Sequence, residues 1–264
     1  MILVDVHAHM DMEGYDMYGG ADKVIEECEA NGVRVIVCNG VDIDSNRKVL
    51  DICSRHDICK PALGIYPTHC LEHIEKGEKD LLDSQLLLIE KLVAQKKAIA
   101  IGEVGLDYYD MKDLSENQKD IMKDCFRRFI EIAKRYDVPI IVHSRKAELE
   151  TIEFLESSDM KGRKVIMHCF SGRKHHVQRI RDNGWYFSIP CNVDRSQQFQ
   201  EIVRDTPLDQ IFTETDAPLL SPILGKSGRP DFVRLSIKKI AEIKGMEPEE
   251  VANIIYNNYQ KVFL

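Results

Sequence analysis

The residues of this sequence best suited to chemistry are histidines and carboxylates that follow short apolar runs. His7 and His9 stand two residues apart after MILVDV, and Glu103 ends AIAIGE. Three more such residues end PIIVH, KVIMH and IFTETD, namely His143, His168 and Asp216. Imidazole and carboxylate groups hold first-row divalent metals, which activate water for hydrolysis. The pattern therefore indicates metal-assisted hydrolysis, provided that the fold brings these residues together.

Each of these residues also has an ordinary structural explanation. A histidine at the end of a strand can simply be hydrogen-bonded, and Glu103 or Asp216 could cap a following helix. As a set they have no shared structural role, because converging carboxylates repel one another and buried imidazoles are costly. Six ligand-type residues exceed the four that one tetrahedral ion uses, which favours two divalent ions with a bridging carboxylate.

The elements that must position these residues alternate regularly along the chain. Strands are predicted at residues 2–9, 33–39, 62–66, 98–103, 139–143, 164–168, 185–189 and 211–216. Helices are predicted at residues 21–31, 45–55, 84–95, 116–136, 146–156, 174–183, 196–205, 231–244 and 247–259. Eight strand–helix repeats in 264 residues predict an α/β fold of the (β/α)8 TIM-barrel type, with a doubly wound open sheet as the alternative.

The barrel prediction fixes where the site must be. No linker divides the chain, so residues 1–264 are predicted to form a single domain. In a barrel the carboxyl ends of the strands meet on one face, where active sites lie. The candidate ligands all end predicted strands, so they are expected to meet there.

Composition narrows the classes of function. The formal charge of −8 argues against non-specific coating of nucleic acid, although a local phosphate site stays compatible with it. Neither a membrane-spanning run nor a cleaved signal peptide is predicted, and nothing indicates an obligatory protein partner. The eight scattered cysteines are expected to be reduced, which favours a cytoplasmic location.

Five motifs carry a resemblance to a known family. HAHMD, GEVGLDYY, IVHSR, HCFSG and ETDAP, in this order, resemble the TatD-type metal-dependent DNases of the amidohydrolase superfamily, over nearly the whole chain. The resemblance implies a (β/α)8 fold and divalent-metal-dependent cleavage of DNA phosphodiesters, often 3′→5′ exonucleolytic. DNA or another phosphodiester is then the expected substrate, and Zn²⁺, Mn²⁺ or Mg²⁺ the expected ions.

The resemblance also implies a role for each candidate ligand. His7 and His9 resemble the ligands of the first ion, and Glu103 resembles the bridging carboxylate. The second ion would be held by His143 and His168, while Asp216 would bind the first ion and take the proton of the attacking water.

Further residues are expected around the ions. Strand alternation places Asp5 and Glu214 on the inward faces of their strands, where each could orient a ligand imidazole or act only as a buried hydrogen-bonding acid. Arg145 and Arg229 are predicted to clamp substrate phosphates, and Tyr66 to donate a hydrogen bond to substrate.

Two segments depart from the pattern of the family. GIYPTH replaces the common G-x-H-P-H, so Tyr66 and Thr68 stand in the histidine places, and SGRPDFV lacks the Asn-Glu-Pro of the last loop. Two alternatives therefore stay open. One is hydrolysis of a small ester, lactone, amide or D-aminoacyl-tRNA at a similar centre, and the other is a non-catalytic barrel with structural metals.

Overall fold

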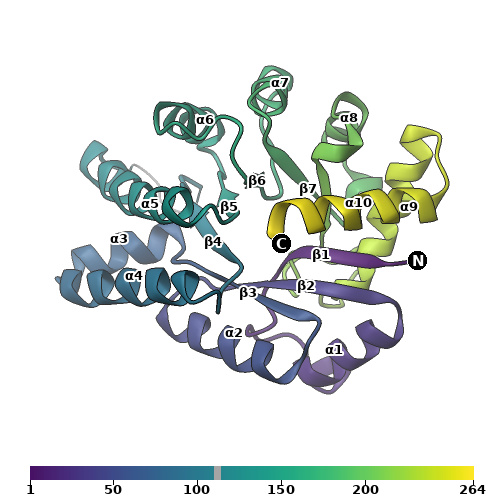
Figure 1. The fold of residues 1–264 in the computed structure, drawn as a ribbon, viewed down its shortest axis with the longest axis horizontal. Coiled ribbons are helices and arrows are strands. Elements are labelled where there is room, and N and C mark those ends of the chain that lie inside the picture. The colour runs from purple at the N-terminus through teal and green to yellow at the C-terminus, as the bar shows by residue number, and fades with distance from the viewer. Residues whose placement is uncertain (110–113) are drawn as a thin grey trace.

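A computed structural model describes residues 1–109 and 114–264 and contains a parallel sheet of eight strands in the order β1 to β8 (Figure 1). The strands are β1 (Leu3–Ala8), β2 (Val33–Asn39), β3 (Cys59–Leu63), β4 (Ala100–Gly105), β5 (Ile140–His143), β6 (Val165–Met167), β7 (Tyr186–Pro190) and β8 (Ile211–Glu214). Every neighbouring pair in this order is parallel, which requires a crossover connection between strands.

The sheet closes into a barrel where the first and last strands meet. The Asp216 N–H donates to the His7 carbonyl at 2.9 Å, and the His9 N–H donates to the Ala217 carbonyl at 2.7 Å. A parallel bridge between Ala8 and Ala217 continues this contact. The (β/α)8 prediction is therefore confirmed, and the open-sheet alternative is wrong.

Helices surround the barrel and close one end of it (Figure 1). They are α1 (Ala21–Ala30), α2 (Ile43–Arg55), α3 (Pro67–Glu75), α4 (Lys79–Ala94), α5 (Glu116–Tyr136), α6 (Glu148–Ser157), α7 (Lys174–Asp182), α8 (Gln197–Asp205), α9 (Val233–Lys244) and α10 (Pro248–Phe263), with short 3-10 turns η1 (Asp16–Tyr18), η2 (Val193–Arg195), η3 (Leu208–Gln210) and η4 (Pro230–Phe232). In α10, the Asn258 amide donates to the carbonyls of Leu208 and Ile211, at the start of β8. Helix α10 thus covers the amino-terminal end of the barrel, opposite the carboxyl ends of the strands.

The region between β3 and α4 differs from the sequence prediction. Strand β3 begins and ends three residues earlier than expected, and α3 was not expected. Pro61 lies within β3 although proline lacks an N–H, and its carbonyl accepts from the Ile99 N–H at 2.9 Å. Helix α3 has nine residues and starts with Pro67 in its first turn.

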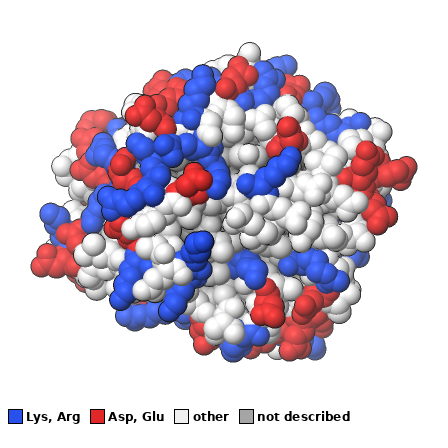
Figure 2. Space-filling model, viewed as in Figure 1, with Lys and Arg blue, Asp and Glu red and all other residues white. Residues whose placement is uncertain are grey.

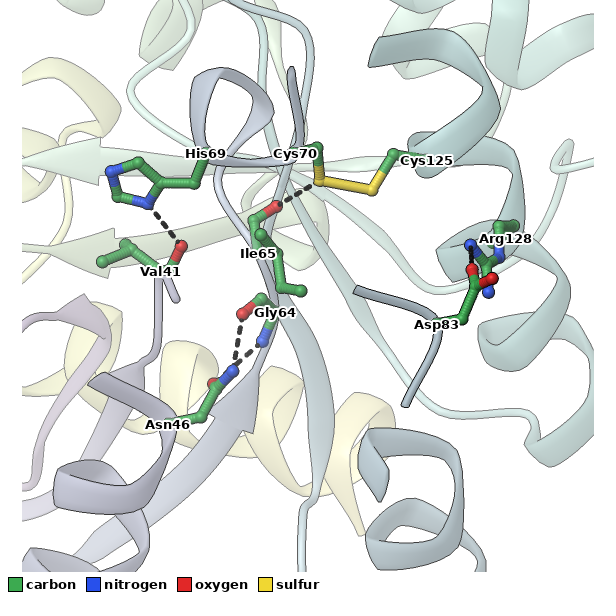
Figure 3. Close-up of a disulfide and its surroundings, with 9 residues drawn as sticks. All are labelled: Val41, Asn46, Gly64, Ile65, His69, Cys70, Asp83, Cys125 and Arg128. Atoms are coloured by element: carbon green, nitrogen blue, oxygen red, sulfur yellow. Dashed lines mark hydrogen bonds and ion pairs between the residues drawn. A yellow bond between two sulfur atoms is a disulfide. The ribbon is translucent and has the colours of Figure 1, made fainter. Parts of the chain in front are cut away.

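One pair of cysteines is oxidised. A disulfide joins Cys70 in α3 to Cys125 in α5, behind the segment that contains His69 (Figure 3). The expectation that all cysteines are reduced is therefore wrong for this pair, because the two packed helices place their sulfur atoms together. The other six are free thiols.

The face of the molecule that α10 crosses has charges of both signs. On the face crossed by α10, Lys and Arg are interspersed with Asp and Glu around an uncharged centre (Figure 2). Such mixing does not produce the single-sign field that attracts a polyanion. None of the helices in the described ranges combines the length and apolar character needed to cross a bilayer.

Candidate metal centre

The six candidate ligands converge at the carboxyl end of the barrel. His7 belongs to β1 and His9 follows it, and Glu103 lies within β4. The remaining three come from β5, from the residue after β6 and from the second residue after β8, namely His143, His168 and Asp216. His7, His9, Glu103 and His168 are buried, while His143 and Asp216 are almost so. Residues up to 209 positions apart in sequence thus share one small volume, as the strand-end pattern predicted.

Four ligand atoms form a compact first cluster. His7 Nε2 lies 3.1 Å from His9 Nε2, and each lies 3.4 Å from Glu103 Oε2. Asp216 Oδ1 lies 3.6 Å from His7 Nε2 and 3.3 Å from His9 Nε2. Ligands about 2.1 Å from a tetrahedral ion lie about 3.4 Å from one another. The donor types and their spacing therefore fit a divalent cation between them.

A second cluster uses the other oxygen of Glu103. Glu103 Oε1 lies 2.8 Å from His143 Nδ1 and 3.9 Å from His168 Nε2. The carboxylate thus presents Oε2 to one pair of imidazoles and Oε1 to another. This is the arrangement that a carboxylate bridging two ions requires.

Hydrogen bonds on the far side of two rings fix their orientation. His9 Nδ1 lies 2.9 Å from the Asn39 carbonyl oxygen, and His168 Nδ1 lies 2.8 Å from Glu214 Oε2. Glu214 also accepts from the Ser188 hydroxyl. Because each Nδ1 donates to an acceptor, each Nε2 faces the clusters and is the nitrogen that can bind an ion once it has no proton.

Without a cation, protons balance the charge of the two carboxylates. Burial alone would raise the pKa of Glu103, but His7 and His143 hold this pKa well below its usual range. Burial would lower the pKa of His9, yet hydrogen bonds to Asp216 and Glu103 raise it well above the usual value. Against the same burial, hydrogen bonds to Asp107 and Glu103 raise the pKa of His143 to about 9. Protonated imidazoles thus supply the positive charge that a metal would supply.

Two unusual backbone features lie beside the ligand clusters, a glycine in close contact with β4 and an aspartate in the left-handed region. A Cβ on Gly64, just after β3, would lie 2.6 Å from the Glu103 carbonyl oxygen, so no larger residue fits there without movement. Asp216 adopts a φ of +53°, a region that aspartate tolerates better than most residues. Both features lie next to the cluster, where strained backbone often accompanies function.

A cavity of about 650 Å³ opens above the clusters. Its polar wall contains five of the candidate ligands, namely His9, Glu103, His143, His168 and Asp216. Its apolar wall is formed by Met12, Val41, Phe199, Leu219 and Leu220. A cavity of this size holds a small ligand or a nucleotide-sized part of a longer one.

The two expected arginines have different surroundings. Arg145 lines the cavity, and its guanidinium carbon lies 3.4 Å from the centre of the Tyr109 ring. Arg229 is instead held by Glu27 at 2.9 Å and by Asp231 at 3.1 Å, away from the cavity-lining residues. The phosphate role predicted for Arg229 stays a prediction, and in this structure its donors are paired with carboxylates.

Asp5, Tyr66 and Asp107 complete the surroundings. Asp5 accepts from the backbone N–H groups of His7 and Thr215, each at 3.1 Å, so it acts as a buried acid that joins β1 to β8. Of the two roles left open for Asp5, these contacts match the buried hydrogen-bonding acid. Tyr66 does line the cavity, but its hydroxyl donates to Asp107 Oδ2 at 2.5 Å.

Sequence reasoning missed three groups near the imidazoles. The roles of Asp107, Ser188 and the Asn39 carbonyl were not assigned, although all three lie next to ligand side chains or their partners. Only Asp107 had a signal, its place in the GEVGLDYY motif. A serine in a strand and a backbone carbonyl have no recognisable pattern in one sequence.

Comparisons with known proteins agree with this geometry. The family described as TatD related DNase matches residues 4–264. The chain is 32% identical to the uncharacterized metal-dependent hydrolase YabD of Bacillus subtilis, over 99% of both chains. It is 32% identical to the deoxyribonuclease TATDN3 of Homo sapiens, over 99% of this chain and 94% of that one. The crystal structure of YJJV, a TatD homolog from Escherichia coli, has the same fold, with a TM-score of 0.83, 24% identity and coverage of 99% and 97%. The chain therefore belongs to the TatD related DNase family.

Proposed function

We propose that this protein is a deoxyribonuclease that uses two divalent metal ions to cleave DNA phosphodiester bonds, removing nucleotides from the 3′ end. Its family membership makes it a metal-dependent hydrolase that acts on ester bonds. The observation that carries the proposal is the position of Glu103, which directs one oxygen to each of two clusters of ligand atoms. Zn²⁺ and Mn²⁺ suit such a set of imidazoles and carboxylates, and Mg²⁺ is a further candidate.

Each residue has a distinct part in the proposed reaction. His7, His9, Glu103 and Asp216 would hold the first ion, and Glu103, His143 and His168 the second. The atoms of His7, Glu103 and His168 also lie close enough together to hold an ion, so His168 borders both clusters. Bound divalent ions lower the pKa of water and withdraw charge from a phosphoryl oxygen. In the metal-free protein, hydrogen bonding to His9 holds the pKa of Asp216 low despite burial, so its carboxylate is ionised. In the loaded site this carboxylate would bind the first ion and take the proton of the attacking water.

Substrate would lie in the cavity above the clusters. Arg145 lines this cavity with its guanidinium stacked on Tyr109, a position from which it would bind a phosphate beside the scissile bond. Stacking on Tyr109 holds the guanidinium in place. The function therefore needs one local cation and no basic surface, which agrees with the charge of −8.

The apolar wall of the cavity favours a second candidate. Met12, Phe199 and Leu219 would suit an acyl or alkyl group, as in a lactone, a small ester or amide, or a D-aminoacyl-tRNA. The same ligand atoms would serve that reaction. The positive charge of Arg145 in the same cavity favours a phosphodiester substrate over these uncharged groups.

Labelled oligonucleotides test the proposal. Metal-free protein is loaded with Mn²⁺, Zn²⁺ or Mg²⁺ and incubated with single- and double-stranded DNA labelled at the 5′ end. A ladder that shortens from the 3′ end is expected, and His143→Ala and Asp216→Asn should lose it. A lactone and an aminoacyl ester are run in parallel. Cleavage of these but not of DNA would favour the second candidate, and equal cleavage by wild type and both variants would contradict the proposed site.

A further inference from the structure

His143 lies between the second cluster and a carboxylate that belongs to neither cluster. Its Nδ1 is 2.8 Å from Glu103 Oε1, and its Nε2 is 2.8 Å from Asp107 Oδ2. A neutral imidazole carries one N–H, and a carboxylate acceptor determines which nitrogen keeps it. In the metal-free protein each nitrogen faces a carboxylate; an ion bound beside Glu103 would take the place of the Nδ1 proton, and Asp107 would keep Nε2 protonated. His9 and His168 have the opposite arrangement, with Nδ1 bound on the far side.

Asp107 is itself held by two further donors. It is fully buried in the loop after β4, and its Oδ1 accepts from the Tyr109 N–H at 2.7 Å. Its Oδ2 accepts from the Tyr66 hydroxyl at 2.5 Å, and that hydroxyl lies 3.0 Å from His143 Nε2. Two donors from different elements thus converge on one carboxylate oxygen. A buried acid with so many partners has little freedom to turn.

We propose that Asp107 and Tyr66 are positioning residues that make His143 a ligand through Nδ1 and thereby set the affinity of the second ion. The inference rests on the proposed function, since it concerns the site of that ion. It assigns a role to Asp107 and replaces the expectation that Tyr66 binds substrate. Tyr66 stands in a place where the family commonly has histidine, and its hydroxyl supplies a donor aimed at Asp107.

A metal titration tests this role without DNA. Metal-free protein is titrated with Co²⁺, and both heat and visible absorption are recorded, because the absorption bands report the ligands of each ion. Wild type is expected to bind two ions. Asp107→Asn keeps the shape but removes the charge, and it should weaken the second ion about 10- to 100-fold without changing the first. Tyr66→Phe should weaken the second ion by a smaller factor, since Asp107 keeps its contact with His143.

Two controls separate positioning from general damage. Thr68→Ala alters a residue that lines the same cavity from the start of α3 and should bind both ions as wild type does. Thermal unfolding of each metal-free variant shows whether the fold is intact. His143→Gln provides the reference for complete loss of the second ion.

The outcomes are distinct. Wild-type affinity for both ions in Asp107→Asn and Tyr66→Phe would overturn the inference, and so would an equal loss of both ions. A wild-type protein that binds a single ion would overturn it as well, while hydrolysis would still be judged on oligonucleotides. A protein that binds two ions, loses the second in Asp107→Asn and yet cleaves no DNA would uphold the inference and contradict the proposed function.

Discussion

Arg145 and Arg229 have the same guanidinium group but different neighbours. Arg145 is exposed at the cavity, with one face of its guanidinium on Tyr109. Arg229 is only 13% exposed in its side chain and lies between Glu27 and Asp231. A guanidinium that is already paired adds little to substrate binding, whereas one that is stacked and available for a phosphate adds more. The two positions should therefore respond differently to the same substitution.

For Arg145→Ala, the KM for oligonucleotides should rise by about 10- to 100-fold, the effect of losing one charge-assisted hydrogen bond. The KM for a small phosphodiester without flanking phosphates should change little. Steady-state kinetics with both substrates measure this difference. Arg195→Ala, which removes an exposed arginine that lies outside the cavity, is the matched control. An equal rise for both substrates would mean that Arg145 does not contact flanking phosphates.

For Arg229→Ala, stability should change and KM should not. The variant leaves Asp231, whose side chain is only 14% exposed, without its cation. We expect the free energy of unfolding to fall by about 1–3 kcal/mol, less than for a fully buried pair because Glu27 is partly exposed. Chemical denaturation measures this quantity, with Arg195→Ala again as the control. A large rise in the KM for oligonucleotides at unchanged stability would restore the phosphate role of Arg229.

For single residues, the sequence predicts the metal ligands better than it predicts the side-chain contacts around them. His143 and Glu103 could be found because each ends an apolar run, and parallel strands bring such ends together. The neighbours of Asp5 and Arg229 could not, because a contact between side chains far apart in sequence depends on loop paths that one sequence does not specify. Asp5 shares a strand face with His7, and Arg229 lies in the SGRPDFV segment, yet both form structural contacts.

At the scale of elements, α3 links the cavity to the outer layer of helices. Its first turn brings Thr68 and His69 to the cavity wall, and the His69 ring contacts the Val41 carbonyl at 2.8 Å. One residue later, Cys70 is bonded to Cys125 of α5 (Figure 3). The helix that carries part of the substrate wall is thus tied covalently to the longest helix of the outer layer.

The disulfide predicts a thiol count and a loss of stability. Denatured, unreduced protein should show six free thiols, and reduced protein eight. Cys125→Ser should lower the free energy of unfolding by about 2–4 kcal/mol, because the bond restricts an unfolded loop of 55 residues. Thiol titration and chemical denaturation measure the two effects, with Cys53→Ser as a free-thiol control. Eight thiols before reduction would contradict the bond.

The eight strands could be predicted from their apolar runs and turn signals, whereas α3 and the position of β3 could not. Pro61 and Pro67 are the reason. Both residues usually mark breaks, but here one lies within a strand and the other begins a helix. Local rules therefore failed in the segment whose sequence departs from the family pattern.

At the scale of the whole molecule, the barrel keeps acids and imidazoles buried together at all times. The closing contacts between β1 and β8 hold His7, His9 and Asp216 together in the metal-free protein. The metal-free protein must then keep its charge balanced with protons, which agrees with the raised pKa values of His9 and His143. Metal binding should release these protons, so that metal affinity and stability become coupled to pH.

This coupling predicts the pH dependence of the metal-free protein. Hydrogen bonds to Asp107 and Glu103 outweigh burial and raise the pKa of His143 from 6.5 to about 9. A raised pKa gives stability that is complete below about 6.5 and is lost as the pH rises through about 9. Glu214, whose pKa burial raises to about 8, changes stability in the same direction. The metal-free protein should therefore lose about 1–3 kcal/mol between about pH 6.5 and 9.

The stabilisation that bound ions give should increase as the pH rises, while the metal-free protein becomes less stable. Ligand nitrogens lose their protons more easily as the pH rises, so the ions bind more tightly and stabilise the fold more. Thermal unfolding of chelated and metal-loaded protein across this pH range should therefore show a widening difference in Tm. His143→Gln removes one titrating ligand and should flatten the curve of the chelated protein. A chelated protein whose Tm rises with pH would show that protons do not occupy the metal centre, and the charge balance argued for these six residues would be wrong.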